Sequence, residues 1–209
     1  GILVDRPFLT ALSAELNQEC ERLVRLICDH AGEEFNVNST PQLRQILFEK
    51  LGLTPVKKTK TGPSTDADSL QKLAGEHPIV ADLLAYREVE KLRSTYADAL
   101  APLIAPDGGV HAMFKQTDTT TGRISSEGPN LQNIPVRTAD GREFRRAFVA
   151  EPGWGLLTAD YSQFELRIAA HVSKDPLLIQ AFAEDEDIHA ATAAAVFGVD
   201  LDQVTRQQR

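Results

Sequence analysis

The sequence predicts an α+β protein in which a helical N-terminal half precedes short strands and further helices. Apolar residues recur three or four positions apart over residues 9–27, which is the period of one long amphipathic helix. A second stripe with the same period covers residues 78–100. After two prolines and a Gly-Gly pair the pattern changes, and Val110, Ala112 and Phe114 alternate as in a strand.

Two short helices are expected between the long ones. The first starts at Ser39, where Ser-Thr-Pro-Gln resembles a capping box, and it ends before Gly52. Residues 56–64 have no apolar period after their first position, so they are expected to form an exposed loop. The second short helix runs from about Asp66 to Ala74.

The second half is expected to contain two more strands. Residues 144–150 form one of them, and residues 155–159 form the other, which is apolar enough to be buried. Helical periods then return, and the predicted helices cover residues 163–173, 176–183 and 188–197.

Composition excludes several classes of protein. No apolar run approaches the roughly 20 residues of a membrane span, and the start at Gly1 lacks the layout of a secretory signal. Cys20 and Cys28 share one predicted helix without a CxxC pattern, so neither a zinc site nor a disulfide framework is indicated. Walker and GxGxxG patterns are absent, which argues against P-loop and Rossmann enzymes. We expect a cytoplasmic protein, and the lack of an initiating Met indicates a piece of a longer chain.

The formal net charge of −8 is unevenly distributed along the sequence. Residues 50–65 hold four lysines and no acid, a local charge of +4, and residues 111–150 hold six cations against four anions, a local +2. Residues 151–209 carry ten acids against four cations, and their dense run at 184–187 is typical of a solvated loop. Because nucleic-acid binding depends on where the cations lie, the two basic regions are candidate phosphate contacts.

The apolar stretch at residues 155–158 ends near a lone carboxylate, Asp160. In the helix predicted to follow, Phe164, Ile168 and Val172 recur every four residues on one face. A carboxylate between a buried strand and a helix start is well placed to hold a metal ion. The simpler alternative is that Asp160 only caps the helix.

Residues 160–167 read Asp-Tyr-Ser-Gln-Phe-Glu-Leu-Arg, which resembles the first carboxylate motif of the family A DNA polymerases, usually Asp-Tyr-Ser-Gln-Ile-Glu-Leu-Arg. Phe164 is the one position that differs. Residues 121–126 (Thr-Gly-Arg-Ile-Ser-Ser) and 129–135 (Pro-Asn-Leu-Gln-Asn-Ile-Pro) resemble the primer- and template-contacting segment of the same family. The motifs occur in the family's order and spacing, which makes the resemblance specific.

The resemblance implies an all-helical thumb at residues 1–104, an incomplete antiparallel-sheet palm at 105–184 and the first helices of the fingers at 185–209. It implies a monomeric, nucleoid-associated bacterial polymerase that uses Mg²⁺ in two-metal phosphoryl transfer, with primer–template DNA and deoxynucleoside triphosphates as partners. The family's second catalytic Asp and its fingers Lys fall after Arg209. The isolated chain is therefore expected to be inactive.

The resemblance also assigns roles to single residues. Asp160 is expected to be the catalytic carboxylate and to hold metal together with the backbone carbonyl of Tyr161. Residues expected to bind the nucleotide are Tyr161, Ser162, Gln163, Glu165, His189 and Arg209. Glu165 resembles the family's steric gate against a 2′ hydroxyl, although a metal ligand or an ion partner of Arg167 are alternatives. For His189 the alternative is a helix cap or a surface residue.

Residues expected to contact DNA are Lys57, Lys58, Lys60, Arg87, Lys91, Arg123, Asn130, Gln132, Asn133 and Arg137. Donors aimed at the minor groove check base-pair geometry without choosing a sequence, because the acceptors there are nearly degenerate. The alternatives are that the lysines of residues 56–64 only solubilise a loop, that Arg87 and Lys91 lie on an ordinary solvated helix face, and that Asn130 and Asn133 satisfy turn amides.

Two other functions compete with the polymerase hypothesis. A non-catalytic primer–template-binding module would keep the DNA contacts and lack the chemistry, and the sequence beyond Arg209 would distinguish it from a polymerase. A metal-dependent nuclease would also use Asp160 and Glu165. The nuclease is disfavoured, because a spacing of five puts two side chains well apart around a helix.

Overall fold

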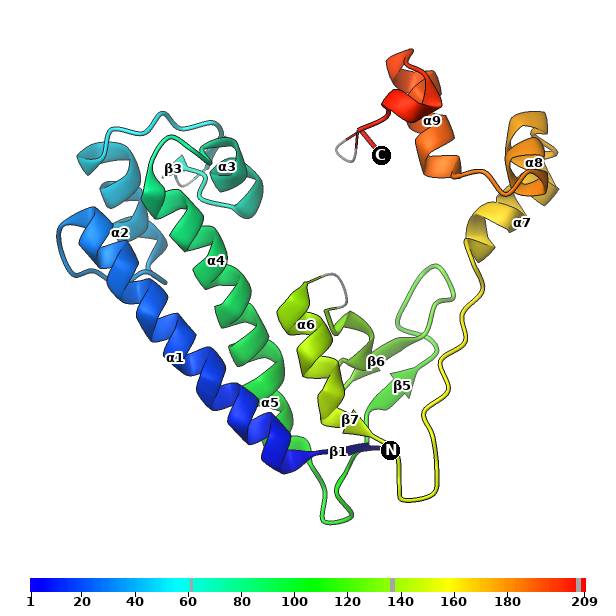
Figure 1. Ribbon diagram of the computed structural model, residues 1–209, viewed down its shortest axis with the longest axis horizontal. Coiled ribbons are helices and arrows are strands. Elements are labelled where there is room, and N and C mark those ends of the chain that lie inside the picture. Colours follow the sequence, from blue (N-terminus) through cyan, green and yellow to red (C-terminus); the bar gives the residue numbers. More distant parts are fainter. Residues whose placement is uncertain (61, 136–137, 206–207) are drawn as a thin grey trace. The chain divides into compact units, whose positions relative to one another are not determined.

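The computed structural model is a mixture of helices and small sheets, and it divides into two compact units (Figure 1). The larger unit is Gly1–Leu156 and the smaller is Leu157–Arg209. The residues that the structure describes are 1–60, 62–135, 138–205 and 208–209. Arg137, one of the predicted DNA contacts, lies outside the described residues.

The larger unit begins its helical arm (residues 6–103) with α1 (Arg6–Ala31). The Asp5 carboxylate accepts a hydrogen bond from the Phe8 amide at 2.9 Å and so starts the helix. Gly32 ends it with a φ of 72°, a left-handed conformation that glycine adopts without a steric penalty. The predicted apolar stripe is the buried face, which consists of Leu9, Leu12, Leu16, Cys20, Leu23, Ile27 and Ala31. The first long helix is thus confirmed.

The second long helix, α4 (Pro78–Leu92), packs against α1 (Figure 1). The ring of His77 accepts a hydrogen bond from the Ile79 amide at 3.2 Å at its start. The chain continues as a π-helical turn (Arg93–Ala97), α5 (Asp98–Leu100) and a 3₁₀ turn (Ala101–Leu103). The helix predicted over residues 78–100 is therefore confirmed, with one wide turn inside it.

Short elements connect the two long helices. They are α2 (Thr40–Arg44), a π-helical segment (Gln45–Lys50), the hairpin of β2 (Lys58–Thr59) and β3 (Gly62–Pro63), and α3 (Ala67–Lys72). The predicted loop at 56–64 therefore contains a small hairpin. The predicted capping box does not form, because the Ser39 side chain makes no capping bond and the Gln42 side chain accepts a hydrogen bond from the Asn36 amide at 2.7 Å.

A three-stranded antiparallel sheet has the order β4 (Gly109–Val110), β1 (Ile2–Val4) and β7 (Phe148–Val149). Within β1, Leu3 pairs with Gly109 on one side and Val149 on the other. A second antiparallel sheet pairs β5 (Met113–Lys115) with β6 (Ser125–Glu127). Residues 110–114, predicted as one strand, therefore contribute to two sheets, and the central strand β1 was not predicted.

The strand predicted over residues 144–150 is wrong in its first part. Phe144 is the last residue of α6 (Ala139–Phe144), and a 3₁₀ turn (Arg145–Ala147) separates α6 from β7. Phe144 and Ala147 are both buried three positions apart, which is a helical spacing. The apolar content of this segment reflects burial, and only its last residues form a strand.

The buried strand predicted over residues 155–159 is also wrong. The segment has no regular secondary structure and is exposed, and Leu157 is 92% exposed. A strand forms where a neighbouring backbone supplies hydrogen bonds. Within the described part of the chain, no backbone hydrogen bond reaches these residues.

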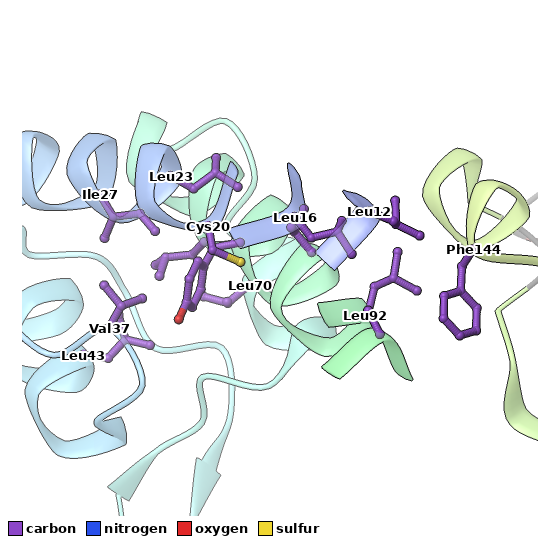
Figure 2. Close-up of a cluster of buried hydrophobic side chains, with 14 of the residues drawn as sticks. Leu12, Leu16, Cys20, Leu23, Ile27, Val37, Leu43, Leu70, Leu92 and Phe144 are labelled. Carbon is purple, nitrogen blue, oxygen red and sulfur yellow. The ribbon is translucent and has the colours of Figure 1, made fainter. Parts of the chain in front are cut away.

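One hydrophobic core runs through the larger unit and joins the arm to the sheet region. Figure 2 shows part of it, with Leu12 of α1, Leu92 of α4 and Phe144 of α6 among the labelled side chains. Ile27 and Leu83 are completely buried in it. The long helices and the sheet region therefore belong to one packed body.

The described residues of the smaller unit form the three predicted α-helices, α7 (Phe164–Ser173), α8 (Pro176–Ala183) and α9 (Ile188–Phe197). Asp175 caps α8, because its carboxylate accepts hydrogen bonds from the Leu177 and Leu178 amides at 3.0 Å. A 3₁₀ turn (Leu201–Gln203) follows α9. Among the described helices of both units, none combines the length and apolarity that a membrane span needs.

Candidate metal and DNA-binding sites

Asp160 lies in an exposed stretch without regular secondary structure before α7. The cap position of α7 belongs to Gln163, which has a left-handed φ of 52°, so the alternative that Asp160 caps this helix is wrong. The Asp160 carboxylate and the Tyr161 carbonyl are hard oxygen donors of the kind Mg²⁺ prefers. Across the described ranges, no three Asp, Glu, His or Cys side chains converge on a possible metal position. Asp160 and Tyr161 are therefore suitable magnesium ligands, but they supply only part of the donors that the ion needs.

Arg167, in α7, contacts both the residues just before this helix and α8. Its Nε donates to the Ser162 carbonyl at 3.0 Å, and its guanidinium lies 4.5 Å from the centroid of the Phe182 ring. Tyr161 is 81% exposed, and the centroid of its ring lies 5.8 Å from that of Phe164. Arg167 therefore links the residues just before α7 to α8.

Two predicted nucleotide ligands meet at the start of α9 through Asp187. One carboxylate oxygen accepts from the amides of His189 and Ala190 at 3.0 and 3.2 Å, and the other accepts from Arg209 Nε at 2.6 Å. The hydrogen bond from Arg209 holds the pKa of Asp187 below its usual range. Asp187, and not His189, is thus the cap of α9, and the His189 side chain is exposed.

The predicted lysine contacts are all exposed: Lys57, Lys58, Lys60 and Lys91. Lys57 Nζ lies 3.3 Å from Asp66 Oδ2. Arg87 differs from the lysines, because it is half-buried and its guanidinium donates to the carbonyl of Thr65. Burial lowers the pKa of Arg87. The guanidinium of Arg87 is therefore hydrogen-bonded to the backbone just after the hairpin.

The segment of the second motif, residues 121–135, is held by hydrogen bonds of its own. The Asn130 side chain accepts from the Gln132 amide at 3.0 Å, which is the turn role considered as an alternative. Gln132 Nε2 donates to the Ile124 carbonyl at 2.8 Å. The carbonyl of Arg123 accepts from the Thr119 hydroxyl at 2.5 Å. One amide donor of Gln132 is therefore already used within the segment.

Tyr96 connects this segment to the helical arm. Its hydroxyl donates to the Asn133 carbonyl at 2.5 Å, and its ring lies 5.8 Å from that of Phe144. A cavity of about 390 Å³ lies between the π-helical turn and the segment, and it is lined mainly by apolar side chains, among them Leu100 and Ile134. The position of Asn133 therefore depends on the arm.

The sequence model of DNA polymerase family A matches residues 6–209. This chain belongs to DNA polymerase family A. It is 55% identical over 203 residues to a thermostable DNA polymerase I from Thermus filiformis, covering 96% of this chain and 24% of that protein. It is 51% identical over 211 residues to DNA polymerase I from Bacillus subtilis, covering 100% of this chain and 24% of that protein. The chain thus spans about a quarter of the length of these curated relatives.

A solved structure gives the same result. It is described as the POL domain of Pol1 from M. smegmatis in complex with DNA primer-template and dNTP. The match has a TM-score of 0.90 and 44% sequence identity, and it covers 100% of this chain and 37% of that one. The family A resemblance predicted from the two motifs is therefore confirmed.

Three residues with structural roles in this family A chain were not predicted. Asp187 lies directly before an apolar helix, so the preference of acidic residues for the cap position could have revealed it. Tyr96 contacts a residue 37 positions away, and Arg44 contacts one 19 positions away. No local pattern signals such contacts, because they depend on tertiary packing.

Proposed function

We propose that this chain is part of a DNA-directed DNA polymerase that adds deoxynucleotides to a primer 3′ end on a DNA template. The observation that carries the proposal is the motif at residues 160–167, within a family A match over residues 6–209. The similarity to a polymerase domain in complex with primer-template and dNTP supports these partners. We further infer a monomer in the bacterial cytoplasm that works at the nucleoid, since the relatives above are bacterial.

The proposed subdomains are a thumb at residues 1–104, a palm at 105–184 and the start of the fingers at 185–209. The helical arm formed by α1 and α4 supports the first of these assignments. The two small antiparallel sheets support the second, and β1 at the N-terminus joins the sheet of the proposed palm. The helix α9 supports the third.

Asp160 and the carbonyl of Tyr161 would hold one Mg²⁺ ion of a two-metal site. Bound divalent ions lower the pKa of the primer 3′ hydroxyl and neutralise charge on the leaving pyrophosphate. The exposed position of Asp160 leaves its carboxylate accessible, and Arg167 fixes the residues that follow it. The chain's own contribution is therefore to orient these two oxygen donors.

The remaining motif residues bind the incoming nucleotide. Glu165, in the first turn of α7, excludes a 2′ hydroxyl by its bulk, beside Tyr161, Ser162 and Gln163. His189 and Arg209 bind the triphosphate from the start of α9. Because Arg209 is hydrogen-bonded to Asp187, this contact must open before the guanidinium can reach a phosphate.

The DNA contacts divide into two sets. Exposed cations bind the phosphate backbone through charge and carry no sequence information. The exposed cations are Lys57, Lys58, Lys60, Lys91 and Arg123, and the proposed set also includes Arg137, which lies outside the described residues. The amides of Asn130, Gln132 and Asn133 donate to minor-groove acceptors. Asn130 can do this while it supports its turn, because its carbonyl oxygen caps and its NH₂ group remains a donor.

The proposal is tested by Asp160→Ala in the full polymerase that contains this chain. Loss of a metal-binding carboxylate removes several kcal/mol of charge stabilisation, so extension of a labelled primer should slow by about 10³-fold or more. Duplex binding should remain largely intact, and Glu151→Gln, which changes an exposed acid outside the motif, should leave both measurements unchanged.

The same assay separates the competing functions. Binding of primer–template without any extension by the unmodified protein would favour the non-catalytic module. Hydrolysis of DNA with Mg²⁺ and no nucleotides, lost on Asp160→Ala, would favour the nuclease. Retained extension by Asp160→Ala would reject the metal role of this residue.

A further inference from the structure

The hairpin that carries the exposed lysines is held at its C-terminal side by two arginines from different helices. Arg44, the last residue of α2, donates from Nε to the Pro63 carbonyl at 2.7 Å. Arg87, in the middle of α4, donates to the Thr65 carbonyl and also lies 3.4 Å from the Thr65 hydroxyl. Figure 1 shows β3 beside α3, near the start of α4. The carbonyls of Pro63 and Thr65 therefore accept hydrogen bonds from side chains of two different helices.

These contacts lie in a partly buried setting. Thr65 is 6% exposed and Ser64 is 4% exposed, whereas Lys58 in β2 and Lys60 in the turn are exposed. The Ser64 amide, directly after β3, donates to the Lys57 carbonyl, directly before β2, at 2.8 Å. This hydrogen bond joins the two ends of the hairpin. Hydrogen bonds to a charged donor are stronger than neutral ones, and they gain from partial burial.

We propose that Arg44 and Arg87 are positioning residues, which hold the lysine hairpin in the orientation that places Lys58 and Lys60 against the phosphate backbone of bound DNA. Arg87 then acts through the lysines and not by contacting a phosphate itself. This inference rests on the proposed polymerase function. It changes the expectation for Arg87, for which the family resemblance suggested a direct contact.

The physical basis is the difference between the two kinds of cation. Lysine is a point charge on a flexible stem, so its contact with phosphate depends on where the backbone carries it. The two-residue strands β2 and β3 cannot fix that backbone alone, since an isolated hairpin is at best marginally stable. The hydrogen bonds from Arg44 and Arg87 attach this backbone to the helical arm.

Salt dependence of DNA affinity distinguishes positioning from direct contact. Each phosphate contact contributes about 0.9 to the slope of log affinity against log salt concentration. Lys58→Gln with Lys60→Gln should therefore reduce the slope of the full polymerase on a primer–template duplex by about 2. Arg87→Gln alone should also reduce the slope, because the hairpin is released.

The decisive variant adds Arg87→Gln to a background in which every lysine of residues 57–60 is replaced, Lys57→Gln/Lys58→Gln/Lys60→Gln. If Arg87 acts only through these lysines, the added substitution should leave the slope unchanged. A further fall of about 1 would show a direct phosphate contact and overturn the proposal. Arg44→Gln should behave as Arg87→Gln does in both backgrounds.

A charge-conserving variant gives an independent test. Arg87→Lys keeps the positive charge but cannot reproduce the forked contact with Thr65, so it should still reduce the slope. A slope equal to that of the unmodified protein would overturn the proposal. Arg22→Gln, which removes an exposed α1 cation paired with Glu19, is the matched control and should leave the slope unchanged.

Hydrogen exchange reports the positioning directly and without DNA. The Ser64 amide should exchange faster in Arg44→Gln and Arg87→Gln, while the amides of α1 keep their protection. Unchanged exchange at Ser64 in both variants would overturn the inference. If the unmodified polymerase failed to bind DNA at all, the proposed function would fall, yet this exchange result would still decide whether the arginines hold the hairpin.

Discussion

At the scale of single residues, Cys20 shows how packing changes chemistry. Its side chain lies on the buried face of α1, as the apolar stripe in the sequence predicted, and its sulfur donates to Glu90 Oε2 at 3.4 Å. Burial, followed by the hydrogen bond to the Glu90 carboxylate, raises the pKa of the Cys20 thiol to about 11. Because the thiolate is the nucleophile, this thiol is unreactive at neutral pH.

We therefore expect iodoacetamide at pH 8 to leave Cys20 unmodified in the folded protein. Its reactivity should rise only as the pH approaches about 11, where the thiolate becomes populated. Peptide mass mapping of a Cys28→Ser variant measures Cys20 separately from the half-buried Cys28. Rapid modification at pH 8 under native conditions would contradict the prediction.

Glu165 is the residue on which sugar selectivity should depend. Its proposed role is steric, so Glu165→Ala should relax the exclusion of ribonucleotides. One methylene group in an apolar pocket changes discrimination by about 10- to 200-fold, and we expect Glu165→Ala to lower the ratio of kcat/KM for dNTP to kcat/KM for NTP by a factor of this order. Glu165→Gln keeps the size of the side chain and should retain most of the selectivity. Unchanged selectivity in Glu165→Ala would reject the gate.

At the scale of elements, the sequence predicted helices well and strands poorly. The helices at residues 9–27, 163–173 and 188–197 formed where predicted, because the apolar period of a helix is a local property. β1 has three residues and its partners lie more than 100 positions later, so no local pattern could reveal it. Residues 155–159 have strand-like composition without a partner in the described chain.

Asp66, which caps the start of α3, makes the stability of this helix depend on pH. Its carboxylate accepts a hydrogen bond from the Ser69 amide at 2.8 Å, and hydrogen bonds from Ser69 and then Ser64 hold the pKa of Asp66 well below its usual range. A depressed pKa means that the folded state favours the ionised form. The resulting stability is present above about pH 4, the unfolded value, and is lost as the pH falls toward the folded value.

We expect Asp66→Asn to remove this pH dependence while keeping an oxygen that can cap α3. The urea midpoint of the helical signal should be higher for the unmodified protein at pH 5–7, and the difference should shrink as the pH falls from about 4 to 2. Circular dichroism at several pH values provides the measurement. If the urea midpoints of the two proteins changed with pH by the same amount, the ionisation of Asp66 would not contribute to stability.

At the scale of the whole molecule, the sequence predicted the family and a helical first half followed by short strands and further helices, but it did not predict which site residues are already hydrogen-bonded within the chain. Arg87 and Gln132 belong to predicted contact sets, yet both donate hydrogen bonds within the larger unit. Such commitments depend on residues that are distant in sequence. The net charge of −8 is equally uninformative, because the exposed lysines of the hairpin make a local positive surface.

The continuous core of the larger unit predicts that the helical arm and the sheet region unfold together. Phe144 is 1% exposed, and its ring lies 5.8 Å from those of Tyr96 in the arm and Phe148 in β7. Phe144→Ala would remove these contacts and enlarge the neighbouring cavity, at a cost of about 3–5 kcal/mol of unfolding free energy.

Because the cost falls on a shared core, hydrogen-exchange protection should decrease both in α1 and in β1 of the Phe144→Ala variant. Phe114→Ala, at a 60% exposed position in β5, is the matched control and should change stability by no more than about 0.5 kcal/mol. Loss of protection confined to the sheet would show that the arm is stable by itself. In that case Phe144 would stabilise only the sheet region, and the arm would orient the lysine hairpin without support from the sheet.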